Sequence, residues 1–174
     1  MTAAGTPLVL LHAFPLDRRM WRPQLDALEP TRPVVAPDLP GFGTLRSNPP
    51  APELDLWADA LEDQLANALG RRPAVVCGLS MGGYVALRLA ARHPKRLAGL
   101  VLADSRAAAD SPESRTARAA SVAAIREHGL AAFVDSLVPR LVSPAATTEL
   151  RASVRALALA QSPATVERAL YAMR

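Results

Sequence analysis

The sequence has little of several features that mark whole classes of protein. It holds one cysteine, Cys77, among its 174 residues, which excludes an internal disulfide framework. No charged start followed by an apolar run marks a secretory signal, so a cytoplasmic protein is expected. The longest apolar runs, such as Ala98 to Ala103, have the length of a strand and are far too short to cross a bilayer. We therefore expect no membrane partner.

Aromatic residues are also scarce, at 4% of the chain, and positive charge is not concentrated in any segment. The formal net charge is +4, but the arginines are scattered singly or in pairs, as at 18–19 and 71–72, with acidic residues between them. Proteins that bind nucleic acid gather Lys and Arg on one face or along one helix. We therefore expect a solvated, arginine-rich surface and no nucleic-acid partner.

Motifs that hold metals or phosphates are missing as well. No cluster of metal-ligating residues is present, and Gly41 and Gly43 lack the spacing and the lysine of a P-loop. We therefore expect no cofactor and no metal.

What the sequence does have is an alternating first half. Half of the residues are hydrophobic, enough for one domain with a sizeable core. Extended segments are predicted at 7–12, 33–38, 74–77 and 97–104, and an apolar stripe from Leu54 to Leu69 predicts a helix that stops at Gly70. Strands this apolar, separated by helices, predict an α/β fold with a parallel sheet covered on both faces.

The second half, from Arg106 onward, loses the strands and becomes rich in alanine. Helices are predicted over 121–129, ending on Gly129, and over 130–142. Two more are predicted to begin at the N-caps Ser143 and Ser162, each followed by proline. We therefore divide the chain into a core of residues 1–105 and a helical cap, or lid, of residues 106–174.

The sharpest corner in the chain is the stretch from Gly78 to Gly82, between a predicted strand and a predicted helix. Glycines two residues to either side of Ser80 allow a turn so tight that the serine adopts a strained conformation and its hydroxyl stands clear of the backbone. A serine nucleophile needs this exposure, a base, and donors for the oxyanion formed on attack. The N–H of Met81 is one candidate donor. The N–H of Phe14, in the loop after the first strand, is the other.

Three motifs carry a family resemblance in their order and spacing: LVLLHAFPLD, APDLPGFG and CGLSMGGYVALRLAARHP. They resemble the α/β-hydrolase superfamily, nearest to its enol-lactonase, esterase and cofactor-free haloperoxidase-like members, and the resemblance covers essentially the whole chain. It implies that Ser80 is the nucleophile and that the N–H groups of Phe14 and Met81 form the oxyanion hole. Ala13 is a departure, because the family usually has glycine there.

The resemblance also implies a catalytic acid and then a histidine later in the chain. The sequence has only three histidines, and we expect none of them to be the base. His12 lies in the loop of residues 12–17, which carries the expected donor Phe14 and is called the oxyanion loop below. His93 lies at the far end of the helix that starts at Ser80, more than about 10 Å away at ~1.5 Å per residue. His128 lies on the cap. We expect His128 to face solvent.

Two further sets of site residues are candidates. Asp104 ends the last predicted strand, where some relatives place their acid; the alternative, which we favour, is that it begins the cap connection and caps a helix. His12, Ala13 and Trp21 are candidates for the substrate pocket. For His12 we favour a second hypothesis, that it braces the oxyanion loop.

Related proteins open with a hairpin and continue, after the cap, with two more strands that carry the acid and the histidine. The sequence is therefore expected to be a truncated hydrolase, with the acid and histidine beyond Arg174 and with sheet edges left open.

The function expected from these residues is that of a carboxylic-ester hydrolase. Its substrate would be a small ester, lactone or enol-lactone, cleaved through an acyl-enzyme on Ser80. Two alternatives stay open: a non-catalytic remnant or binding protein on the hydrolase scaffold, and a cofactor-free perhydrolase or haloperoxidase. The sequence indicates neither the individual substrate nor the oligomeric state.

Overall fold

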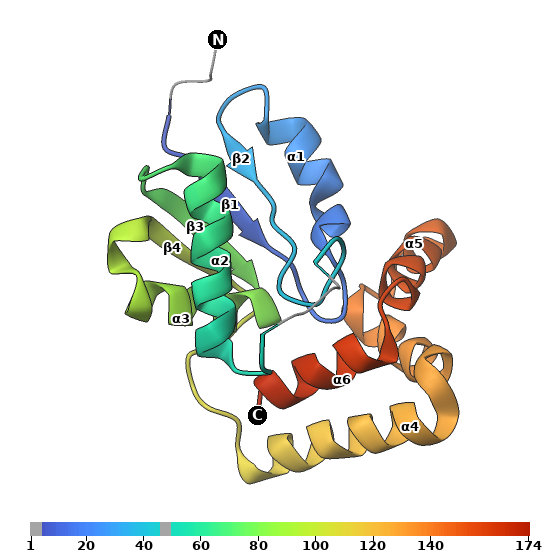
Figure 1. The fold of residues 1–174 in the computed structure, drawn as a ribbon. Coiled ribbons are helices and arrows are strands. Elements are labelled where there is room, and N and C mark those ends of the chain that lie inside the picture. Colours follow the sequence, from blue (N-terminus) through green and yellow to red (C-terminus); the bar gives the residue numbers. More distant parts are fainter. Residues whose placement is uncertain (1–4, 46–49) are drawn as a thin grey trace.

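The computed structural model describes residues 5–45 and 50–174, and a parallel sheet lies at its centre (Figure 1). The strands are β1 (Leu8–Leu11), β2 (Val34–Val35), β3 (Ala74–Leu79) and β4 (Leu97–Ala103), in the order β2-β1-β3-β4. Every pairing is parallel. The predicted parallel sheet is therefore confirmed, with β1 and β3 in its middle.

The register of the sheet brings the loops after β1, β3 and β4 to one edge. Leu11 at the end of β1 pairs with Gly78, and Leu79 at the end of β3 pairs with Ala103. Since the carboxyl ends of parallel strands meet at the same edge, the loops that begin at His12, Ser80 and Asp104 are neighbours.

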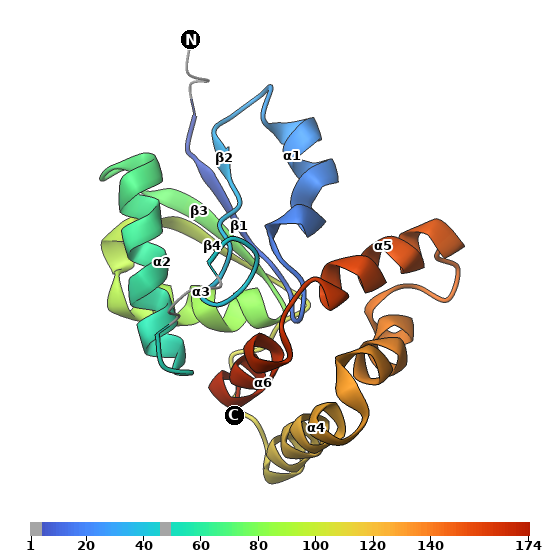
Figure 2. The same cartoon turned by 45° about the vertical axis from the view of Figure 1, so that its right-hand side comes forward.

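Helices cover both faces of the sheet. The short 3-10 helix η1 (Arg18–Trp21) leads into α1 (Arg22–Leu28), and Figure 2 shows α1 on the side of the sheet opposite to α2 (Leu54–Leu69). Helix α3 (Met81–Arg92), followed by the 3-10 helix η2 (Pro94–Arg96), packs beside α2. The predicted apolar stripe of α2 is buried, with Trp57 and Leu61 fully inaccessible to solvent.

Strand β2 is shorter than the predicted segment 33–38. Only Val34 and Val35 pair with β1, because Pro37 has no N–H to continue the ladder. The chain turns away at Asp38, whose carboxylate accepts hydrogen bonds from the N–H and hydroxyl of Thr44, at 2.8 and 2.9 Å. Asp38 thus organises the glycine-containing loop 39–44.

Helices α4 (Pro112–Leu141), α5 (Thr148–Leu159) and α6 (Pro163–Ala172) lie beyond the carboxyl ends of the strands (Figure 1). Gly129 interrupts α4 with a φ of 83°, where the sequence predicts a helix end. The first part of α4 begins at Pro112, however, nine residues before the predicted start. Its N-cap is Ser111, whose hydroxyl accepts from the N–H of Ser114. A serine followed by proline is therefore the start signal here too.

The two predicted N-caps of the cap helices have opposite outcomes. Ser162 caps α6, accepting from the N–H of Thr165 at 3.1 Å, as predicted. Ser143 does not cap α5, because the N-cap of that helix is Thr147. The guanidinium of Arg151 donates to the carbonyls of Ser143 and Pro144, which holds this segment as a turn before the helix.

The cap helices share one hydrophobic cluster with the sheet and its helices. Its members from the cap include Val122, Phe133 and Val166, and from the core Val9, Val76 and Leu89. In the ranges that the structure covers, no helix is long and apolar enough to span a membrane. The boundary at residues 105 and 106 stays a prediction.

Strand β4 differs from the other strands in its exposure. It forms one edge of the sheet, and Leu100, Val101 and Leu102 are 37%, 46% and 38% exposed. Both faces of the strand therefore carry apolar side chains in contact with solvent, and its outer backbone groups face no further strand among the described residues.

Candidate active site

The turn at Ser80 has the strained geometry that its sequence predicts. Ser80 joins β3 to α3 with φ 52° and ψ −113°, a conformation rare for a residue with a side chain. Its N–H donates to the carbonyl of Ala103, and its own carbonyl accepts from the Ser105 hydroxyl and from the N–H of Gly83, each at 2.9 Å. The backbone of the serine is thus held on both sides by hydrogen bonds.

Glycine is required around this turn because other backbone lies against it. A Cβ on Gly82 would come within 2.4 Å of the Leu11 carbonyl oxygen, and one on Gly78 within 2.3 Å of the Gly82 oxygen. The first turn of α3 therefore packs directly on the end of β1. This close packing places Ser80 and Met81 beside the loop that starts at His12.

The two expected oxyanion donors come from these neighbouring segments. Met81 is the first residue of α3, so its N–H is among those that have no acceptor within the helix. Phe14 lies three residues after the end of β1, and its ring makes an edge contact with Phe133 of α4, at 6.4 Å between centroids. The structure brings the two segments together at one edge of the sheet. Their role as the oxyanion hole stays a prediction.

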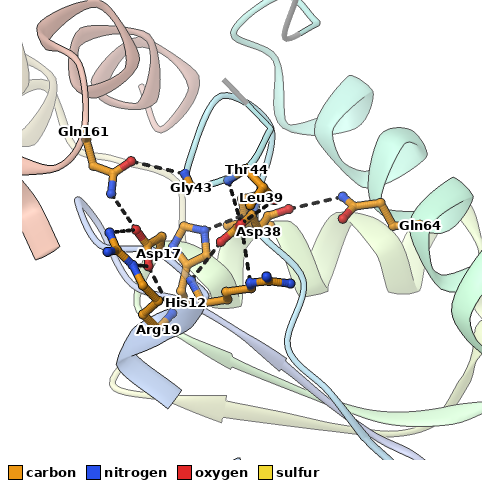
Figure 3. A network of polar contacts seen from close by, with 10 residues as sticks. His12, Asp17, Arg19, Asp38, Leu39, Gly43, Thr44, Gln64 and Gln161 are labelled. Carbon is orange, nitrogen blue, oxygen red and sulfur yellow. Dashed lines mark hydrogen bonds and ion pairs between the residues drawn. The ribbon is translucent and has the colours of Figure 1, made fainter. Parts of the chain in front are cut away.

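His12 is fully buried, and both of its ring nitrogens have partners (Figure 3). Nε2 accepts from the N–H of Leu39 at 3.0 Å, so the proton is on Nδ1, which lies 3.1 Å from the carbonyl oxygen of Ala13. Burial lowers the pKa of His12 below its ordinary value, and the ring is neutral. These contacts are those of a residue that braces the oxyanion loop.

Of the other two residues expected in the substrate pocket, Ala13 follows His12 directly and Trp21 is the last residue of η1. Ala13 is buried, and its N–H donates to the sulfur of Met20 at 3.3 Å. Trp21 is buried too, and its indole N–H meets no acceptor within the described part of the chain. That Ala13, Trp21 and His12 contact a substrate stays a prediction.

The remaining histidines lie away from the turn between β3 and α3 at Ser80, which is called the elbow below. His93 follows the last residue of α3, about 18 Å from Ser80 at the usual ~1.5 Å rise per residue, and its Nε2 lies 2.7 Å from a carboxylate oxygen of Asp59. His128 lies on α4 with its side chain 60% exposed, as expected for a residue that faces solvent. No histidine of the sequence is thus placed to take a proton from Ser80.

Asp104 lies at the edge of the site. It is exposed, has a φ of 42°, and stands between Ala103 and Ser105, which both hydrogen-bond to the Ser80 backbone. The interpretation that Asp104 caps a helix is wrong, because the next helix, α4, begins seven residues later at the N-cap Ser111. Its alternative role as the catalytic acid stays a prediction.

The sequence reasoning missed a buried polar network behind the oxyanion loop (Figure 3). Asp17 accepts from the N–H and the guanidinium of Arg19 and from the side-chain amide of Gln161. An aspartate just before a short helix is a recognisable capping signal, so Asp17 was open to prediction. Gln161 is 144 residues away in sequence and has no such signal.

A sequence model of the family described as "Alpha/beta hydrolase family" matches residues 8–173, almost the whole chain. The chain belongs to this family. The resemblance and the fold expected from its three motifs are thereby confirmed. The matched range of this α/β hydrolase includes the turn at Ser80 and the loop that begins at His12.

Named relatives of this α/β hydrolase are esterases and a lactonase. It is 39% identical to a pimeloyl-[acyl-carrier protein] methyl ester esterase from Aromatoleum aromaticum, over 95% of this chain and 61% of that protein. It matches a thermophilic esterase from Thermogutta terrifontis with a TM-score of 0.89 and 36% identity, over 99% of this chain and 64% of the other. It matches an enol-lactonase from Burkholderia xenovorans with a TM-score of 0.80 and 28% identity, over 98% of this chain and 65% of the other. The chain thus spans less than two thirds of these relatives.

Proposed function

We propose that this α/β hydrolase cleaves carboxylic esters, with Ser80 as the nucleophile. The observation that carries the proposal is the backbone of Ser80, held at a φ of 52° directly before α3 by a hydrogen bond that it donates to β4 and one that it accepts from Ser105. Proteins adopt such strained geometry where a function requires it, and here it presents a hydroxyl at a helix N-terminus. The esterase and lactonase names of the relatives support ester chemistry.

The proposed reaction has two steps. The Ser80 oxygen attacks the ester carbonyl while a base takes its proton, and the tetrahedral oxyanion accepts hydrogen bonds from the N–H groups of Met81 and Phe14. The base returns the proton to the departing alcohol, which leaves an acyl group on Ser80. Water then attacks this acyl-enzyme in the same way and releases the carboxylic acid.

The base is proposed to come from outside these 174 residues. His12 is neutral with both ring nitrogens engaged, His93 lies at the far end of α3, and His128 faces solvent. The apolar edge of β4, which has no further strand beside it in the described part of the chain, follows β3 in the sheet and is suited to receive another strand, which would bring new residues near Ser80. Asp104 is the proposed acid, since residues on both sides of it contact the Ser80 backbone.

The proposed substrates are short-alkyl esters and lactones. The relative that is 39% identical is named for a methyl ester whose acyl chain is joined to an acyl-carrier protein, and others are named as an esterase and an enol-lactonase. Comparing turnover of a free methyl ester with that of the same acyl chain on a carrier protein will show whether a protein carrier is recognised.

Turnover and active-site labelling test the proposal. We expect hydrolysis of a short-chain p-nitrophenyl ester and labelling by a fluorophosphonate, both abolished in Ser80→Ala, with a loss of about 10⁴-fold or more. Ser153→Ala, which alters an exposed serine of α5, is the matched control and should change neither. Hydrolysis that persists in Ser80→Ala would refute the proposed nucleophile.

The second candidate is a non-catalytic binding protein on the same scaffold, favoured because His12 has both ring nitrogens engaged and His93 and His128 lie away from Ser80. The intact mass of the protein from its source cell separates the candidates. A mass above 18.4 kDa, with turnover, supports the esterase and its additional residues. A mass of 18.4 kDa without turnover supports the binding protein.

A further inference from the structure

One side chain of the cap reaches both loops that frame the site. Gln161 lies between α5 and α6, is only 4% exposed, and contacts three segments. Its amide nitrogen donates to Asp17 at 2.8 Å and to the carbonyl of Leu157 at 3.0 Å, and its amide oxygen accepts from the N–H of Gly43 at 3.2 Å. Figure 3 shows this amide between the oxyanion loop and the glycine-containing loop.

The chemistry of Asp17 requires a donor at position 161. Burial by itself would raise the pKa of Asp17, but hydrogen bonds from Arg19 and Gln161 hold the pKa below its ordinary value, so the group is a carboxylate. A carboxylate only accepts hydrogen bonds. Gln161 is suited to the position because an amide gives a donor to Asp17 and an acceptor to Gly43 from one side chain.

The segment that begins at His12 and ends at Asp17 touches the cap at two points. Asp17 meets Gln161, and the ring of Phe14 meets Phe133. Within the segment, the carbonyl of Ala13 accepts from the N–H of Leu16 at 2.9 Å and lies against His12 Nδ1, and the N–H of Ala13 donates to the sulfur of Met20. A shift of the cap therefore acts on the peptide that carries the Phe14 N–H.

We propose that Gln161 is a positioning residue: its amide clasps the cap to the oxyanion loop and so fixes the Phe14 N–H relative to Ser80. The inference rests on the proposed function only for its effect on turnover. The second cap-to-loop hydrogen bond, from the Thr165 hydroxyl to the carbonyl of Gly41 at 2.9 Å, joins the same glycine-containing loop and does not reach the oxyanion loop. Gln161 alone thus joins Asp17 to the cap by a hydrogen bond within the described residues.

The substitution Gln161→Glu tests the clasp without changing the size of the side chain. At neutral pH the introduced carboxylate cannot donate a hydrogen bond to Asp17, and the two negative charges repel each other. Burial and Asp17 raise the pKa of the introduced group, so it gains a proton as the pH falls and can donate again. Arg19 is the charged group that binds Asp17 directly, and Arg18, Arg19 and Asp38 line, with Asp17 and Ala160, a cavity of about 450 Å³ beside this position.

Hydrogen exchange is the first measurement. In Gln161→Glu, peptides covering residues 12–21 and 39–44 should exchange about tenfold faster than in the unaltered protein at about pH 8, and the difference should shrink at about pH 5. The matched control is Gln24→Glu on the exposed side of α1, which should change neither peptide. Unchanged exchange at the higher pH, or the same acceleration in the control, would overturn the proposal.

A neutral variant keeps the test open if the charged one does not fold. Gln161→Met removes the donor without adding charge, so the same peptides should exchange faster with no recovery at low pH. Acceleration spread over the whole chain would show general destabilisation and count against a clasp.

Turnover is the second measurement. Where the unaltered protein hydrolyses an ester, Gln161→Glu should lower kcat about tenfold with KM nearly unchanged, because the oxyanion forms only in the transition state. An unaltered protein without turnover refutes the proposed function and leaves the exchange experiment to decide the clasp.

Discussion

The two ends of helix α3 are held in place by different forces. At its N-terminus, Gly82 and Gly83 allow the helix to touch the end of β1 and the side chain of Ser105, and Ser80 is strained. Towards its C-terminus, ion pairs join it to α2: Arg88 with Asp55, Arg92 and His93 with Asp59, and, in η2 just beyond the helix, Arg96 with Glu62.

The difference shows how the helix separates stability from chemistry. Side-chain charges at four-residue spacing fix the far end to α2, so the elbow end needs no ionic partners of its own. At that end, small residues bring the helix into direct backbone contact with β1. At the N-terminal end of α3 we expect stability to respond most to changes in side-chain size. At the C-terminal end we expect it to respond most to changes in charge or pH.

The largest effect should come from adding one methyl group at the elbow end. Gly82→Ala places a Cβ 2.4 Å from the Leu11 oxygen and 2.9 Å from the His12 oxygen, and backbone atoms cannot move aside easily. We expect a loss of about 3 kcal/mol, measured by urea unfolding. The control Gly99→Ala, whose Cβ would meet only Val75 at 3.5 Å, should change stability by less than about 1 kcal/mol. Equal losses in both variants would contradict the steric explanation.

The next effect should come from the innermost ion pair at the other end. Arg96 is nearly inaccessible to solvent, pairs with Glu62 at 2.6 Å, and donates to the carbonyls of Gly70 and Arg72. Arg96→Met leaves the carboxylate and both carbonyls without this donor, and should cost about 2 to 4 kcal/mol in thermal or urea unfolding. Adding Glu62→Gln should recover part of the loss. No recovery would show that the carbonyl contacts carry the effect.

Acid should weaken the same end. Hydrogen bonds from Arg92 and then from His93 lower the pKa of Asp59 from 3.8 to about 2. Because the pKa is depressed in the native state, the stabilisation is present above about pH 4 and is lost as the pH falls through about 2. In Asp59→Asn, the free energy of unfolding should depend less on pH in this range. Asp26→Asn, in an exposed pair with Arg22 on α1, is the control, and an equally flattened curve there would contradict the assignment.

The smallest effect is expected from the outermost pair. Arg88 and Asp55 form a bidentate ion pair, but their side chains are 45% and 38% exposed. Exposed pairs contribute little, so Arg88→Ala should cost about 0.5 kcal/mol and less in high salt. A loss as large as that of Arg96→Met would show that the ion pairs act as one network.

The features that the sequence predicted depend on neighbouring residues. The elbow needs only glycines two positions from Ser80, the Ser162 cap needs only its own turn, and the alternation of strands and helices is visible in short windows. The parallel sheet and the family followed from these local patterns. Gly129 likewise interrupts a helix because of its own backbone freedom.

The features that the sequence did not predict depend on distant partners. Ser143 has the pattern of an N-cap, but Arg151 binds its carbonyl and the helix takes Thr147 as its N-cap instead. Gln161 gains its importance from Asp17 and Gly43, which lie 144 and 118 residues away in the sequence. A capping pattern states what a residue can do within one turn, and tertiary contacts decide whether it does so.

The parallel sheet also sets the order in which the chain can fold during synthesis. Leu8 in β1 pairs with Val75 in β3, 67 residues later. At about 5 to 20 residues per second, the ribosome needs about 3 to 13 s to make the partner after the strand. During that time β1 has only the two-residue pairing with β2. Strand β1 is thus open to wrong pairings for that time, and slower translation lengthens it.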